Sequence, residues 1–187
     1  MRKGEHCGLK GDGKMVTGLG RHLFFAMVVV VMVFGNFGTH SFAAEKAKAS
    51  ELSKALGQAK LFAGLSNKQR TALKSVATLR HCKEGERIIE QGKPLDKMFI
   101  FLEGQAEVRV NGKVVATLPE QSLVGEVEFL DRLPASADVI ILKETRLIEL
   151  NNSALSGLMK KQPRLGYALM SEIARIEGQR LRAMDQK

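Results

Sequence analysis

Histidine and cysteine are scarce in this sequence and unevenly placed, which leaves few side chains for many kinds of catalytic and metal sites. Three of the four histidines and one of the two cysteines lie before residue 44: His6, His22, His40 and Cys7. The remainder of the chain keeps only His81 and Cys82, which are adjacent. A structural zinc site needs about four nitrogen or sulfur ligands. Residues 44–187 therefore cannot supply such a site alone.

The sequence motifs of common enzymes are also missing. There is no G-x-S-x-G nucleophile turn and no G-x-x-x-x-G-K-[ST] phosphate loop. Neighbouring residues of a strand point to opposite faces of a sheet, so His81 and Cys82 are not placed to act as a catalytic pair. We expect no enzymatic activity, no metal ion and no resident cofactor.

The charge balance is basic but diffuse. The formal net charge is +9, and residues 44–187 carry 24 basic against 18 acidic side chains. Without a cluster of Lys and Arg, such an excess favours solubility and is a weak sign of nucleic-acid binding. Only five residues follow Arg182, too few for a helix-turn-helix domain. We therefore expect no nucleic-acid partner.

One long apolar run stands near the start of the chain. Leu23–Phe34 contains 12 apolar residues, follows several basic residues, and is followed by the small-residue site Ser41-Phe42-Ala43. As a helix it spans about 18 Å, short of the roughly 30 Å hydrocarbon core of a bilayer. This is the pattern of a secretory signal peptide over residues 1–43. It predicts a periplasmic or secreted protein that begins near Ala44.

Two alternatives remain open for this segment. An uncleaved membrane anchor over residues 23–44 is the first, and translation from Met15 instead of Met1 is the second. In an exported chain the odd thiol of Cys82 either is buried or pairs between chains, and burial beside a strand is the expectation.

The middle of the chain reads as short strands punctuated by glycines. Ala106, Val108 and Val110 alternate with polar residues, which indicates a half-buried strand, and Asn111-Gly112 is a hairpin signal. The predicted strands are 87–91, 97–103, 105–110, 113–118, 137–142 and 145–150. The last two are expected to form a pair around Lys143-Glu144. Such spacing predicts a small antiparallel barrel or roll.

Helical patterns flank this region. Residues 44–60 are expected to be a linker or helix, and Ser66 to Gln69 fits a capping box that opens a helix. Asn151 or Asn152 can cap a short helix, and residues 163–187 form a last one. Leu165, Leu169, Ile173 and Ile176 make one apolar stripe on it. The stripe is expected to cover the roll, with at most a weak homodimer, because Gly178 interrupts it.

Three segments stand out in order along the chain: LFAGLS (61–66), KEGERIIEQGKPLDKMFIFLEGQAEV (83–108) and GEVEFLDRLPASADV (125–139). In this order they resemble the cyclic-nucleotide-binding domain of the catabolite-activator and protein-kinase-A regulatory-subunit type. The resemblance implies an α+β fold, an antiparallel β-roll of jelly-roll type over residues 61–162, flanked by N-terminal and C-terminal helices. It also implies cyclic AMP or cyclic GMP as the ligand.

The third segment looks like the family's phosphate-binding cassette. By that resemblance, Gly125 lets the backbone approach the ligand, Glu126 holds a ribose hydroxyl, and Ser136 and Ala137 fit the small residues of the pattern. The position where the family has its phosphate-binding arginine is Ala135. Losing a charge-assisted hydrogen bond costs about 1.5–3 kcal/mol. We therefore expect nucleotide binding to be weak, altered or lost.

Alternatives stay open at these positions. Arg132 or Arg146 could replace the missing cation, or both could be solvated. Gly125, Glu126 and Ser136 could serve the turn and the helix end alone. The leading function is an exported sensory or regulatory domain. The alternative is a structural or interaction module that uses the roll and the last helix for protein partners or homodimerisation.

Overall fold

The computed structural model describes residues 39–186. The chain divides into two units, Met1–Ala44 and Glu45–Lys187, and the description below concerns the second. The predicted leader run Leu23–Phe34 lies outside the described residues, while residues 44–58 belong to a helix. The helices are α2 (Thr39–Gln58), the 3-10 turn η1 (Lys60–Phe62), α3 (Asn67–Leu73), α4 (Glu126–Asp131), α5 (Asn152–Lys161) and α6 (Pro163–Met184).

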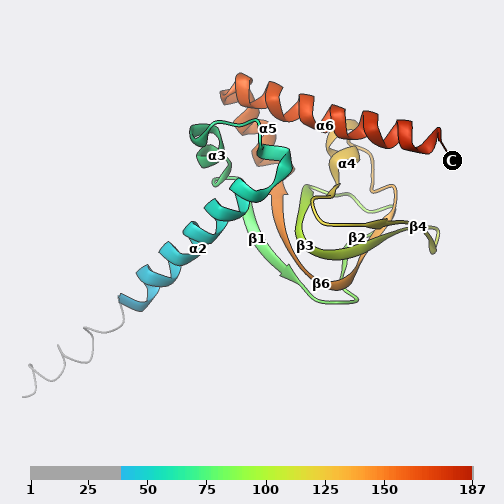
Figure 1. Cartoon of the computed structure of the whole chain (residues 1–187), viewed down its shortest axis with the longest axis horizontal. Helices are drawn as coiled ribbons and strands as arrows, with labels where there is room; N and C mark the ends of the chain where they lie inside the picture. Colours follow the sequence, from blue (N-terminus) through green and yellow to red (C-terminus); the bar gives the residue numbers. More distant parts are fainter. Residues whose placement is uncertain (1–38, 187) are drawn as a thin grey trace, which may run out of the picture. The chain divides into compact units, whose positions relative to one another are not determined.

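Six antiparallel strands form the predicted roll (Figure 1). They are β1 (Ala77–Cys82), β2 (Arg87–Ile89), β3 (Lys97–Val110), β4 (Lys113–Leu118), β5 (Leu123–Val124) and β6 (Asp138–Asn151). The main strand order is β1-β6-β3-β4, with β2 paired to β6 and β5 paired to β3. The α+β fold class, an antiparallel roll with flanking helices, is thereby confirmed.

The two longest strands correct the sequence prediction. Residues 97–110 were expected as two strands broken at Gly104, and residues 137–150 as two strands around Lys143-Glu144. Each pair is instead one continuous strand, β3 and β6. Their pairing shifts register between Glu103 opposite Arg146 and Gln105 opposite Lys143. The interruptions in the pattern therefore mark a shared bulge and bend, where the paired strands turn together.

Gly104 is the residue that the bend requires. Its φ is +101°, and a Cβ there would lie 2.2 Å from Thr145 Oγ1 and 2.8 Å from the carbonyl oxygen of Glu144. No side chain fits in that space without moving β6. Gly104 thus allows β3 and β6 to come close together at a bulge. From the local sequence alone, a glycine with this role cannot be told from a glycine in a turn.

Other local predictions are confirmed. The β4 bounds are the expected ones, and Asn111 and Gly112 both have positive φ in the hairpin that joins β3 to β4. Ser66 Oγ accepts a hydrogen bond from the backbone N–H of Gln69, whose side-chain oxygen accepts one from the backbone N–H of Ser66. Strands β1 and β5 were not predicted.

The alternation of β3 separates two apolar clusters. Met98 and Ile100 pack with the helices, whereas Phe99 and Phe101 lie in the second cluster, inside the roll. This is the period of two that a strand imposes on its side chains. Cys82 is fully buried in the second cluster, and burial raises the pKa of its thiol.

The predicted stripe of α6 is buried in the first apolar cluster, where α6 packs mainly against α5 and η1. Leu165, Leu169 and Ile173 are buried in the first cluster and Ile176 packs against it. Beyond the stripe, Figure 1 shows α6 passing over α4. Among the residues that the structure describes, none of the helices is both long and apolar enough to cross a membrane.

Candidate functional site

The four predicted cassette residues lie around one cavity. Gly125, Glu126, Ser136 and Ala137 all line a space of about 230 Å³ between the roll and α4. Its other walls are mainly aliphatic side chains of the roll: Ile89, Val108, Leu118, Val124 and Val139. Residues that were singled out from the cassette pattern are therefore neighbours in space.

Gly125 sets the turn from β5 into α4. Its φ is +81°, and an added Cβ would stand 2.5 Å from the carbonyl oxygen of Lys97. Only glycine meets both conditions at low cost. The first residue after it, Glu126, begins α4 at the cavity wall, and its side chain is 3% exposed.

Ala135 lies beside the cavity instead of lining it. Its side chain is 3% exposed and packs in the second apolar cluster with Ile89 and Val139. Its backbone N–H donates to the carbonyl of Lys93, and its carbonyl accepts from the N–H of Gly92. The loop that carries this residue is thus tied to the preceding turn, and the position supplies no cation to the cavity.

Ser136 is engaged by a carboxylate of the chain itself. Glu128 Oε1 accepts the backbone N–H of Ser136 at 3.0 Å and its hydroxyl at 3.4 Å. Glu128 is 7% exposed. These donors of the cassette loop are therefore already bound to an internal anion.

Arg180 of α6 enters the cavity, which sequence reasoning did not foresee. Its Nη1 donates to Glu126 Oε1 and, at 2.8 Å, to Glu177 Oε1. Its Nη2 donates to the carbonyl oxygen of Leu123 at 2.5 Å. The second oxygen of Glu126, Oε2, is buried without a hydrogen-bond partner in the structure. A guanidinium from the last helix thus meets the buried carboxylate of the cassette.

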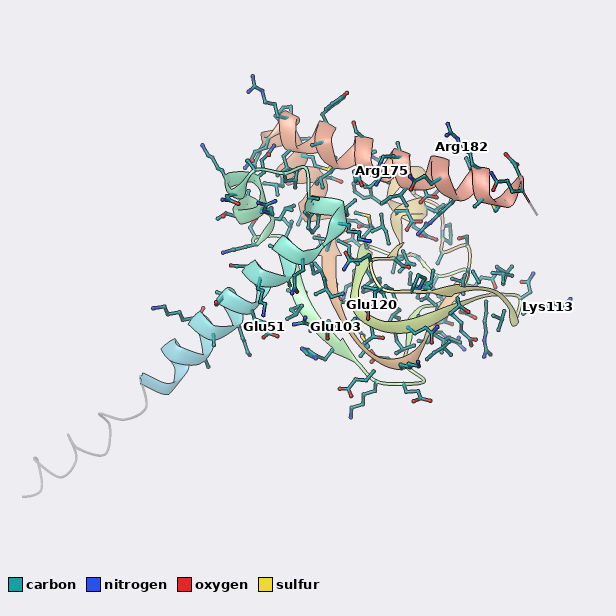
Figure 2. The ribbon with its side chains drawn as sticks, in the orientation of Figure 1. Glu51, Glu103, Lys113, Glu120, Arg175 and Arg182 are labelled. Carbon is teal, nitrogen blue, oxygen red and sulfur yellow. The ribbon has the colours of Figure 1, made fainter. Side chains whose placement is uncertain are left out.

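The two arginines considered from the sequence lie elsewhere. Arg146 donates to Glu103 and also pairs with Glu51, both of which Figure 2 labels. Arg132 lines a different, more polar hollow of about 540 Å³ that includes Asp96 and Asn152. Neither arginine lines the cassette cavity.

Burial controls the protonation of Glu126. Removal from water raises the pKa of this carboxyl from about 4.5 to about 7, and the nearby Arg180 opposes the rise. Glu177 adds to it as a like charge. Within residues 39–186, no cluster of His, Cys, Asp and Glu is arranged to hold a metal ion.

Comparison with known proteins places this geometry in a family. Residues 79–162 match the family model described as cyclic nucleotide-binding domain. This part of the chain belongs to that family. The matched segment contains the cassette cavity's roll residues, including Gly125, Glu126, Ser136 and Ala137. Arg180 lies outside it.

Relatives of the cyclic nucleotide-binding domain family occur in proteins of several kinds. The Pycsar effector protein XpPycTIR of Xanthomonas perforans is 32% identical over 114 residues, covering 59% of this chain and 38% of that protein. Glutaminase 2 of Bradyrhizobium diazoefficiens is 29% identical, covering 71% and 21%. A cAMP-dependent protein kinase regulatory subunit of Mycosarcoma maydis is 31% identical, covering 53% and 21%. The chain thus spans well under half the length of these relatives.

Solved structures agree on the fold. A cyclic nucleotide-binding domain from Methylobacillus flagellatus superposes with a TM-score of 0.62 at 23% identity, covering 72% of this chain and 79% of that one. The regulatory domain of Toxoplasma gondii protein kinase A with cAMP gives 0.61 at 18% identity, covering 73% and 52%. At these identities the likeness supports the roll and its helices.

The raised pKa of Glu126 predicts a pH dependence of stability. Between about pH 4.5 and 7 the folded protein holds a proton that the unfolded chain has released, so this group's contribution to stability falls as the pH rises. Urea unfolding at about pH 5 and about pH 8 should show the wild type losing stability relative to Glu126→Gln, which does not titrate.

Glu172→Gln is the matched control. Arg175 lowers the pKa of Glu172, so Glu172 is ionised in both states across this range. The free energy of unfolding of Glu172→Gln should therefore change between the two pH values by the same amount as that of the wild type. If the difference in unfolding free energy between the wild type and Glu126→Gln is the same at the two pH values, the raised pKa of Glu126 is contradicted.

Proposed function

We propose that this chain is a regulatory domain of the cyclic nucleotide-binding family in which affinity for cyclic AMP and cyclic GMP is weak or lost. The observation that carries the proposal is the occupation of the cassette by the chain's own groups. Glu128 holds the N–H of Ser136, and the neighbouring Ala135 is packed in the core instead of offering a guanidinium.

Charge supports the same conclusion. Two carboxylates line the cavity, Glu126 and Glu128, against one cation, Arg180 of α6, which is already paired with Glu126. A cyclic phosphate carries a negative charge, so its entry brings like charges together in a site shielded from water, where repulsion is strong. The cavity of about 230 Å³ is also below the roughly 300–1,000 Å³ of usual small-molecule sites.

Regulation in this proposal acts through helix α6. The helix lies on the apolar core by Leu169 and Ile173 and reaches the cassette by Arg180. A change in the cassette therefore alters what holds the end of α6. The proposed activity is binding.

Replacing Glu128 tests the explanation for weak binding. Glu128→Ala removes one negative charge and frees the Ser136 N–H, and one charge-assisted hydrogen bond is worth about 1.5–3 kcal/mol. We therefore expect at least a tenfold gain in affinity for cyclic AMP or cyclic GMP, at 1.4 kcal/mol per decade, measured by calorimetric titration.

Glu120→Ala, at an exposed carboxylate that Figure 2 labels, controls for net charge. It should leave the affinity unchanged. Tight binding by the wild type, or no gain in a folded Glu128→Ala protein, would contradict the proposal.

Export is a separate part of the proposal. It is supported by the apolar run Leu23–Phe34, the basic residues before it, and Ser41-Phe42-Ala43 after it. Intact-mass measurement of the protein from its native cell should give a chain that begins near Ala44. A full-length species in the cytosol would contradict export.

A further inference from the structure

The cavity's charges favour a ligand of the opposite sign to a phosphate. Glu126 and Glu128 are both more than nine-tenths buried. Among the described residues that line the cavity, the one cation is Arg180, which comes from α6 and not from the roll. A buried carboxylate without a cation is costly. The roll therefore presents a place that a cation stabilises.

The contacts suit a guanidinium in particular. A guanidinium has five N–H donors in a flat fork, whereas an ammonium is a compact point charge. Arg180 directs its donors to two carboxylates and to the carbonyl of Leu123 at once. Glu126 Oε2, buried and without a partner, offers a further acceptor on the same wall.

The walls suit the rest of an arginine side chain. Besides its carboxylates, the cavity is lined by aliphatic residues that include Val108, Leu118 and Val139. Such a surface buries methylene groups while the charged head keeps its hydrogen bonds.

We propose that the cassette cavity is a guanidinium-binding site, that Arg180 is its built-in ligand, and that this contact attaches the end of α6 to the roll. The site is the one treated under the proposed function, but this inference requires no nucleotide to bind. It stands even where every nucleotide titration gives no heat.

Chemical rescue tests the site. Arg180→Ala leaves a space that n-propylguanidinium should fill, raising the melting temperature by about 3 °C at roughly tenfold above its Kd. The wild type, in which Arg180 already pairs with Glu126, should not respond. Arg182→Ala is the matched control, because Figure 2 shows Arg182 on the outer side of α6, away from the roll. It should neither lose stability nor respond.

Two further ligands separate the inference from its rivals. n-Propylammonium at the same concentration should give a clearly smaller rise, and cyclic AMP should give none. Equal rises with both cations, or no rise with n-propylguanidinium in a folded Arg180→Ala protein, would overturn the inference. A rise with cyclic AMP alone would show an anion site and overturn the inference, whereas the proposed function is contradicted only by tight nucleotide binding to the wild type.

A conservative pair covers the case in which Arg180→Ala does not fold. Arg180→Lys and Arg182→Lys both keep the charge and the aliphatic stem. Amide hydrogen exchange over residues 177–184 should be faster in Arg180→Lys than in Arg182→Lys, because the ammonium does not reproduce the fork. Equal protection of this segment in the two variants would mean that the guanidinium does not hold α6.

Discussion

The carboxylate of Glu126 is buried at the cavity wall, and a buried charge must find a cation or take up a proton. Both answers are visible here. Arg180 reaches it from α6, and burial raises its pKa to about 7. The ion pair between Glu126 and Arg180 therefore links the cassette to the last helix. This ion pair, together with the apolar stripe of α6, sets the position of the end of the helix.

The roll itself depends on the bend that β3 and β6 share. Gly104 allows the two strands to approach where Thr145 leaves no room for a side chain. Beyond the bend, β3 brings Val108 to the cavity and β6 brings Val139, so the two strands provide part of its aliphatic wall. Gly125 then turns the chain into α4 and places Glu126 against them.

Local features were predictable from the sequence because their causes are local. The hairpin at Asn111-Gly112 and the capping box at Ser66 depend on neighbours a few residues away. The break predicted at Gly104 was wrong because a glycine with positive φ serves a bulge as readily as a turn. Strand β5 has two residues, too few to show a period.

The site was predictable in part. Gly125, Glu126, Ser136 and Ala137 are close in sequence, and the cassette pattern grouped them. Arg180 is 54 residues from Glu126, and their contact depends on how α6 docks. One signal was available: Arg180 follows Ile176 by four residues, so it continues the buried stripe with a charge. A charge at such a place needs a partner in the core, and here the partner is Glu126.

The coupling between Glu126 and Arg180 is the central claim, and a double-mutant cycle measures it directly. Urea unfolding of Glu126→Gln, Arg180→Gln and the double variant gives the interaction free energy of the pair. We expect about 1 kcal/mol or more, reduced from the value for a fully buried pair because the Arg180 side chain is 36% exposed. The exposed Glu172–Arg175 pair on the same helix, in a parallel cycle, should show much less. Coupling between Glu126 and Arg180 no larger than that of the exposed pair would contradict the account.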